Sequence, residues 1–163
     1  MFKREIIDNL SRGIGQPVLR NFQLALRSTD ATRLQNTLRQ YLLCSASAFD
    51  LAKEDFYHGM MLGLLAVMSE DYSIRSNRES GEGRFDIELR PLVKTRPGII
   101  MEFKASDAAE EAILGKLAEE AIAQAKNKLY ATELKASGAP SIQIYGIAFA
   151  KKKATVKTIC LSD

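Results

Sequence analysis

Cysteine is scarce in this 163-residue sequence, and long apolar runs are missing. The two cysteines, Cys44 and Cys160, lack the CxxC or Cys/His spacing of a zinc site, so we expect buried free thiols and no zinc. No apolar run approaches the about 18 residues that a membrane-spanning helix needs. The first ten residues, MFKREIIDNL, lack the apolar core of a signal peptide. The sequence therefore predicts a cytoplasmic protein without membrane contact.

A strong charge of one sign is also absent. The chain has 23 Lys and Arg against 20 Asp and Glu, a net charge of +3, which is too mild to indicate nucleic-acid binding by itself. Lys151–Lys153 suits a solvated hairpin turn better than a phosphate-binding patch. No GxxxxGK[ST] loop is present, which excludes a P-loop ATPase from this chain. With 46% hydrophobic residues, the length suits one globular domain.

Residues 81–105, GEGRFDIELRPLVKTRPGIIMEFKA, predict two strands joined by a turn. In RFDIELR, apolar and charged residues alternate, so Asp86 lies on the charged face. The segment GIIMEF is apolar enough to be a central strand that is buried on both faces. Glu102 and Lys104 end this strand on one face, with Cα atoms about 7 Å apart. A buried carboxylate there needs a cation or a proton.

If Asp86 lies on the neighbouring strand, two carboxylates and an ammonium group meet at one point. Oxygen ligands of this kind suit a hard divalent cation. The alternative interpretation is that Asp86, Glu102 and Lys104 form an exposed, salt-bridged patch on an edge strand. The apolar character of GIIMEF favours the first interpretation.

Helical periodicity predicts three short helices in residues 1–45, with Thr29 or Asp30 as an N-cap and Leu24 on an inward face. A fourth helix is expected at 50–69. A long helix is expected from Asp107, as its N-cap, to about residue 137, with Ile113 on its buried stripe. Strands are expected at 72–77, 142–149 and 155–161. The predicted order is helices followed by β-β-β-α-β-β.

Asp86, followed by Glu102-Phe103-Lys104 at the end of a hydrophobic strand, resembles the signature of the PD-(D/E)xK, or restriction-endonuclease-like, nuclease superfamily. The segment ESGEGRFDI, with KEDFYHG upstream and an AxxQAKNKLYA helix downstream, is similar to the nuclease-like domain at the C-terminus of prokaryotic AAA-ATPase-like proteins. The resemblance covers roughly residues 45 to 150. It implies an α/β fold with a restriction-endonuclease-like mixed sheet flanked by helices. Residues 1–45 would then be a helical lead-in packed on a nuclease-like domain at 46–163.

The resemblance also implies which residues perform the chemistry. Asp86 and Glu102 would bind Mg²⁺ or Mn²⁺, and Glu54 is a further metal ligand unless it forms an exposed pair with His58. The residues expected to be catalytic are Asp86, Glu102, Lys104 and Gln124. The residues expected to contact the substrate are Arg84, Lys128 and Tyr130. Arg84 has an alternative role as an ion-pair partner of Glu79 or Glu82.

The implied function is that of a metal-dependent endo- or exonuclease, with DNA favoured over RNA as the substrate. Lys104 would orient or deprotonate the attacking water, or stay protonated and stabilise charge on phosphorus; the sequence leaves both roles open. The alternative function is a catalytically silent nucleic-acid-binding or regulatory module of an AAA-ATPase-like protein. A third hypothesis is that the N-terminal helices form a homodimer.

Overall fold

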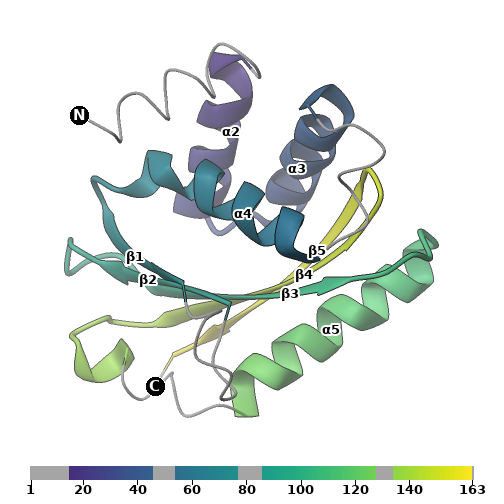
Figure 1. The fold of residues 1–163 in the computed structure, drawn as a ribbon. Coiled ribbons are helices and arrows are strands. Elements are labelled where there is room, and N and C mark those ends of the chain that lie inside the picture. The colour runs from purple at the N-terminus through teal and green to yellow at the C-terminus, as the bar shows by residue number, and fades with distance from the viewer. Residues whose placement is uncertain (1–14, 46–53, 77–85, 128–133, 163) are drawn as a thin grey trace.

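The computed structural model describes residues 15–45, 54–76, 86–127 and 134–162. It has a five-stranded sheet with helices on both faces (Figure 1), which confirms the predicted α/β class and the β-β-β-α-β-β order. None of the described helices is long and apolar enough to cross a membrane. The helices are α2 (Gln16–Arg27), α3 (Ala31–Ser45), α4 (Glu54–Leu65), the 3₁₀ helix η2 (Ala66–Met68) and α5 (Glu111–Asn127). The strands are β1 (Tyr72–Ser76), β2 (Ile87–Pro91), β3 (Gly98–Ala105), β4 (Ile142–Ala150) and β5 (Lys153–Leu161).

The sheet is mixed, and its strands lie in the order in which they occur along the chain. β1 pairs with β2, and β2 with β3, in antiparallel fashion. β3 and β4 are parallel, because α5 carries the chain back across the sheet between them. β5 then returns antiparallel to β4 as an edge strand. β3 therefore occupies the central position that its apolar sequence predicts.

Helices α2, α3 and α4 cover one face of the sheet, and α5 covers the other (Figure 1). Because side chains alternate along a strand, β3 contributes to both layers. Met101 and Phe103 belong to the core that includes α2, α3 and α4, whereas Ile100 packs with residues of α5. The same alternation turns Glu102 and Lys104 toward α5. The polar end of β3 therefore lies on the face that α5 covers.

Helix α5 packs directly against the backbone of β4 at Gly146. A Cβ atom at this position would lie only 2.1 Å from the backbone oxygen of Ala118, so a side chain there would push the helix off the sheet. In the parallel pairing, Gly146 lies beside Glu102 of β3. The absence of a side chain at Gly146 therefore lets α5 pack tightly at the level of the buried carboxylate.

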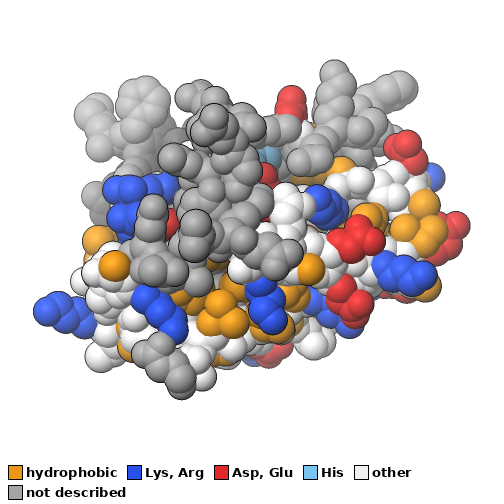
Figure 2. Space-filling model, turned by 90° about the horizontal axis from the view of Figure 1, so that it is seen from below, with side chains coloured by type: hydrophobic (Ala, Val, Ile, Leu, Met, Phe, Trp, Pro, Cys, Tyr) orange, Lys and Arg blue, Asp and Glu red, His pale blue; other side chains and the backbone are white. Residues whose placement is uncertain are grey.

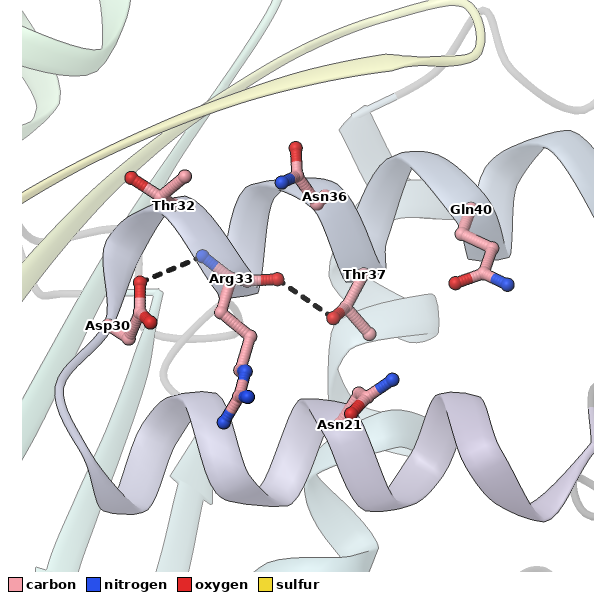
Figure 3. Close-up of a pocket in the computed structure, with 7 residues that line it drawn as sticks. All are labelled: Asn21, Asp30, Thr32, Arg33, Asn36, Thr37 and Gln40. Atoms are coloured by element: carbon pink, nitrogen blue, oxygen red, sulfur yellow. Dashed lines mark hydrogen bonds between the residues drawn. The ribbon is translucent and has the colours of Figure 1, made fainter.

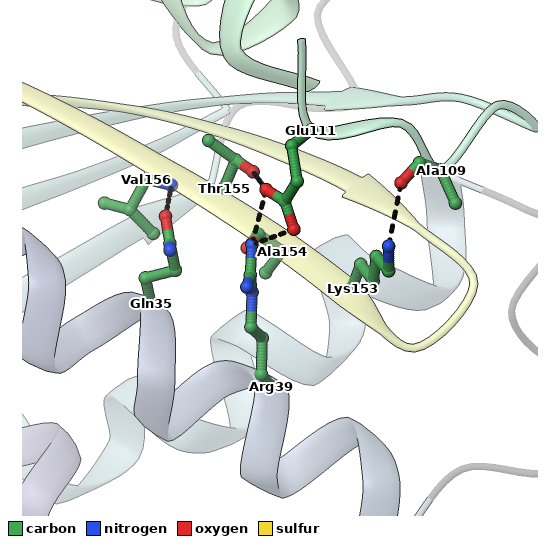
Figure 4. A network of polar contacts seen from close by, with 8 residues as sticks. All are labelled: Gln35, Arg39, Ala109, Glu111, Lys153, Ala154, Thr155 and Val156. Carbon is green, nitrogen blue, oxygen red and sulfur yellow. Dashed lines mark hydrogen bonds and ion pairs between the residues drawn. The ribbon is translucent and has the colours of Figure 1, made fainter. Parts of the chain in front are cut away.

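Edge strand β5 is tied to α3 by polar side chains (Figure 4). The backbone N–H of Val156 donates to Oε1 of Gln35 at 3.0 Å, and Nε of Arg39 donates to the carbonyl oxygen of Ala154 at 2.7 Å. The same arginine donates through Nη2 to both carboxylate oxygens of Glu111, at 3.0 and 2.9 Å. These contacts satisfy edge backbone groups that would otherwise face solvent. They also join α3 to the first turn of α5.

The Lys151–Lys153 segment forms the predicted turn between β4 and β5. The Tyr57 hydroxyl of α4 donates to the carbonyl oxygen of Lys151 at 2.9 Å. Burial raises the pKa of Tyr57 to about 12. Lys153 donates through Nζ to the carbonyl oxygen of Ala109, at 3.2 Å. The turn is thus held from both layers.

Several helix predictions need correction. α5 begins at Glu111 rather than after an Asp107 cap, because the Ser106 hydroxyl accepts a hydrogen bond from the Ala108 N–H and holds a turn there. Within α5, Ile113 is 40% exposed and Leu114 is fully buried, so the prediction that Ile113 lies on the buried stripe is wrong. The predicted helix to about residue 137 is described only to 127 and again from 134.

In the N-terminal half, Asp30 is confirmed as the cap of α3, since its Oδ1 accepts from the Arg33 N–H at 2.9 Å. Leu24, however, is exposed rather than inward-facing. Both Cys44 and Cys160 are exposed free thiols, so the prediction of buried thiols is wrong. The first predicted helix and the proposed domain boundary near residue 45 lie in or next to residues outside the described ranges.

We expect Gly146→Ala to destabilise the fold by roughly 1–3 kcal/mol, because the new methyl group collides with backbone rather than with a flexible side chain. The matched control is Gly115→Ala within α5, where an added Cβ meets nothing within 4 Å. There we expect a gain of about 0.5–1 kcal/mol from helix propensity. Urea unfolding of both variants measures the difference; equal stabilities would contradict the close approach of α5.

Candidate active site

Asp86 lies at the point where β2 and β3 separate. The antiparallel pairing of the two strands ends with Ile87 opposite Met101. Asp86 is the residue before β2, and its carboxylate contacts the backbone of Phe103, the residue after Glu102 in β3. The two carboxylates predicted to meet therefore come from the adjoining ends of β2 and β3.

The Asp86 carboxylate also takes the place of a strand partner. Its Oδ2 accepts a hydrogen bond from the backbone N–H of Phe103 at 2.6 Å. Because β2 no longer pairs with β3 at this level, that N–H would otherwise lack the partner that a longer β2 would give it. The hydrogen bond fixes Asp86 against the end of β3 and leaves Oδ1 available for another contact.

Glu102 is buried, with only 3% of its surface exposed. It points toward α5 from the middle of the sheet, beside Gly146. Burying an ionised carboxylate is expensive unless a cation or hydrogen-bond donors compensate for the lost water. Because Glu102 is buried and β3 is a central strand, the alternative interpretation of an exposed patch on an edge strand is wrong for Glu102.

Lys104 lies two residues beyond Glu102, at the half-buried end of β3. Its Nζ donates to Oε1 of Gln124 on α5 at 2.6 Å. An ammonium group has three N–H donors, so this hydrogen bond orients the group and leaves two donors for other contacts. Gln124 of α5 therefore contacts Lys104 directly and holds the lysine side chain in place.

The other predicted site residues are Arg84, Lys128, Tyr130 and Glu54. Arg84, Lys128 and Tyr130 lie outside the described residues. Glu54 begins α4, but its side chain is not among those described. α4 lies on the opposite face of the sheet from α5 (Figure 1), so Glu54 starts from a different layer than Gln124.

His58 is not the exposed residue that the Glu54 pairing implied. It is only 5% exposed, and its Nε2 lies 2.8 Å from the hydroxyl oxygen of Ser76. Its ring meets that of Phe103 edge-on, with centroids 5.9 Å apart. His58 therefore packs behind β3, on the face opposite Lys104, and supports the strand that carries the candidate site.

Glu88 is a buried carboxylate to which sequence reasoning assigned no role. It is 1% exposed and forms an ion pair with Arg90 two residues later. The alternation of apolar and charged residues in RFDIELR predicts that Glu88 faces the same side as Asp86, and this pattern could have identified it. Because Arg90 already compensates its charge, Glu88 is a structural residue of the sheet beneath the site.

The described surface around this face has no continuous basic region. Figure 2, viewed from the α5 side, shows acidic and basic side chains intermingled. The exposed positions of α5 include Glu119 and Glu120 as well as Lys116. Attraction of a polyanion to this face therefore has to come from a bound cation or from residues outside the described ranges.

The donors present fit a hard cation in their chemistry. Asp86 and Glu102 offer carboxylate oxygens, and Mg²⁺ is commonly bound through one or two carboxylates while it keeps several waters. Within residues 15–45, 54–76, 86–127 and 134–162, no group of three or more His, Cys, Asp or Glu side chains could hold a metal ion. The described site therefore supplies two carboxylates, and any third must come from elsewhere.

Comparison with known proteins agrees with this geometry. The sequence pattern of the PD-(D/E)XK nuclease superfamily matches residues 52–159, about two thirds of the chain. The match includes Asp86, Glu102, Lys104 and Gln124. No curated protein matches the chain.

We expect Asp86→Ala to cost about 1.5–3 kcal/mol of stability, because it removes a charged acceptor from the Phe103 N–H. Asp86→Asn keeps a carbonyl oxygen at the same place and should cost less, about 0.5–1.5 kcal/mol. Chemical denaturation without metal compares the two variants. If alanine were no worse than asparagine, the hydrogen bond would not be structural.

Proposed function

Because the chain belongs to the PD-(D/E)XK nuclease superfamily, we propose that it hydrolyses phosphodiester bonds of nucleic acid with Mg²⁺ or Mn²⁺ as its cofactor. The observation that supports this most is the arrangement at the end of β3. The Asp86 carboxylate accepts a hydrogen bond from the Phe103 N–H, and Glu102, the residue before Phe103, is buried. Lys104, the residue after Phe103, donates a hydrogen bond to Gln124 of α5. DNA is the favoured substrate, and RNA is the alternative.

Asp86 and Glu102 would hold the metal ion through carboxylate oxygens, with Glu54 as a further ligand from α4. A bound divalent ion lowers the pKa of water and stabilises charge that develops on the phosphoryl oxygens. Asp86 can serve as a ligand through Oδ1 while Oδ2 stays on the Phe103 N–H. One residue would thus both hold the strand end and bind the ion.

Lys104 acts on the attacking water or on the phosphate. Its hydrogen bond to Gln124 sets the direction of Nζ, so the other two N–H groups can reach a phosphate oxygen or the water. Preorganised donors of this kind stabilise developing charge without reorganising during the reaction. Arg84, Lys128 and Tyr130 would contact the substrate backbone beyond this centre.

A second candidate function is a catalytically silent nucleic-acid-binding or regulatory module of an AAA-ATPase-like protein. The observation in favour of a regulatory role is the mixed charge of the described α5 face, which gives no strong attraction for a polyanion. In this case the helices α2 and α3 would connect the domain to its ATPase-like partner or to a second copy of the chain. The two candidate functions make opposite predictions for cleavage.

We expect wild-type protein to degrade plasmid or single-stranded DNA with Mg²⁺ or Mn²⁺. Asp86→Asn and Lys104→Ala should lower the rate by roughly hundredfold or more, since positioned charges and bases typically contribute that much. Lys116→Ala, an exposed lysine on α5, is the matched control and should keep the wild-type rate. If Asp86→Asn and Lys104→Ala both cleave as fast as wild type, the catalytic assignment is wrong.

Thermal unfolding with and without metal separates ion binding from catalysis. Mn²⁺ at about 100 times its dissociation constant should stabilise wild type by about 2.7 kcal/mol. Asp86→Asn should lose most of this gain while remaining folded. Stabilisation of both proteins to the same extent would place the ion away from Asp86, and stabilisation without cleavage would favour the silent module.

A further inference from the structure

Helices α2 and α3 on one face of the sheet and α5 on the other lie in segments of opposite charge. Residues 15–45, which form α2 and α3, contain four arginines and one aspartate, a net charge of +3. Residues 106–127, which include α5, contain two lysines and five acidic residues, a net charge of −3. Residues 54–76, which include α4 on the same face as α2 and α3, contain four acidic residues and one arginine, a net charge of −3. The positive charge of this face is therefore confined to α2 and α3, which would attract a polyanion locally, whereas the outer surface of α5 would repel it.

A polar groove of about 410 Å³ runs between α2 and α3 (Figure 3). Asn21 projects from α2, and Arg33 and Thr37 project from α3 toward it across the gap. No apolar side chain is among the residues that line this groove. Its lining residues are Asn21, Asp30, Thr32, Arg33, Asn36, Thr37 and Gln40.

Two of the four arginines in this layer have no acidic partner among the described residues. Arg27 pairs with Asp71, and Arg39 pairs with Glu111. Arg33 in the groove and Arg20 on α2 form no ion pair within the described part of the chain, and both are exposed. Their positive charge is therefore available to a ligand.

Asp30 and Thr37, which line the groove, both form hydrogen bonds with the backbone of α3. Asp30 accepts the Arg33 N–H as the cap of α3, and the Thr37 hydroxyl donates to the Arg33 carbonyl oxygen at 2.8 Å. The groove therefore presents the guanidinium of Arg33 and the carboxylate of Asp30, one charge of each sign, together with the amide groups of Asn21, Asn36 and Gln40. Guanidinium groups bind phosphate through two parallel hydrogen bonds, and amides donate to phosphate and sugar oxygens.

We infer that the α2–α3 groove binds the sugar-phosphate backbone of a nucleic acid, in a layer separate from the one that holds Asp86. The inference rests on the proposed function for its class of ligand. Groups of this kind read charge and spacing rather than base identity, so the binding is independent of sequence and weakened by salt. The groove increases affinity for the substrate, whereas the site at the end of β3 performs the reaction.

The test measures binding of fluorescently labelled 20-nucleotide DNA and RNA, single-stranded and duplex, in EDTA at several salt concentrations. Arg33→Gln and the double variant Arg20→Gln/Arg33→Gln should bind several-fold more weakly. The slope of log K against log [salt] should shrink by about 0.7–0.9 for each phosphate group that the variant no longer neutralises. Lys116→Gln removes the same charge from α5 and should bind as wild type does. Arg33→Lys keeps the charge and should keep most of the slope.

Equal affinity and slope for wild type and the double variant would overturn the inference. A reduction of the same size in Lys116→Gln would also overturn it, because net charge alone would then explain the effect. Cleavage with Mg²⁺ distinguishes this outcome from failure of the proposed function. If wild type cleaves while the groove variants bind normally, only the groove is wrong. If the groove variants bind weakly while wild type cleaves nothing, the result supports nucleic-acid binding in the groove and contradicts the proposed nuclease activity.

Discussion

The distance at which α5 can pack on the sheet governs the rest of this structure. Because Gly146 has no side chain, the backbone of α5 comes against β4 beside the level of Glu102. That contact brings Gln124 within hydrogen-bonding distance of Lys104 and covers the polar end of β3 with a helix. Without this contact, a long lysine side chain at the end of a strand would sample many rotamers. The packing of α5 on the sheet therefore sets the position of Lys104 in the candidate centre.

Residues of the candidate centre also stabilise the fold at the end of β3. Asp86 completes the hydrogen bonding of β3 where β2 ends, so the strand terminates in a carboxylate rather than in an unsatisfied N–H group. Glu102 is buried in β3, whose residues Met101 and Phe103 belong to the core on the other face of the sheet, beneath α2, α3 and α4. Burying a carboxylate in this way costs stability, and natural proteins tend to accept such costs where a site is needed. Membership of a nuclease superfamily agrees with that expectation.

The sequence predicted what depends on local periodicity. Alternation in β2 and β3 is a property of neighbouring residues, and it correctly indicated a central β3 and a shared face for Glu102 and Lys104. Predictions failed where distant contacts or turns decide the outcome. The Ser106 turn delays the start of α5. Packing of α5 on the sheet buries Leu114 and leaves Ile113 exposed. Burial of His58 against Phe103 depends on how α4 packs over β3, and helical spacing alone does not show it. The catalytic and metal-binding roles themselves stay predictions, because they concern chemistry rather than fold.

The contacts of Gln35 and Arg39 with β5 have a consequence for association. An open strand edge is a template on which another chain can add a strand, and such addition underlies domain swapping and fibril growth. At Val156 and Ala154 the outward backbone groups are already occupied by side chains of α3. Loss of α3 from its position would therefore do more than weaken the fold. It would expose a strand rich in β-branched residues and convert this boundary of the sheet into a nucleus for aggregation.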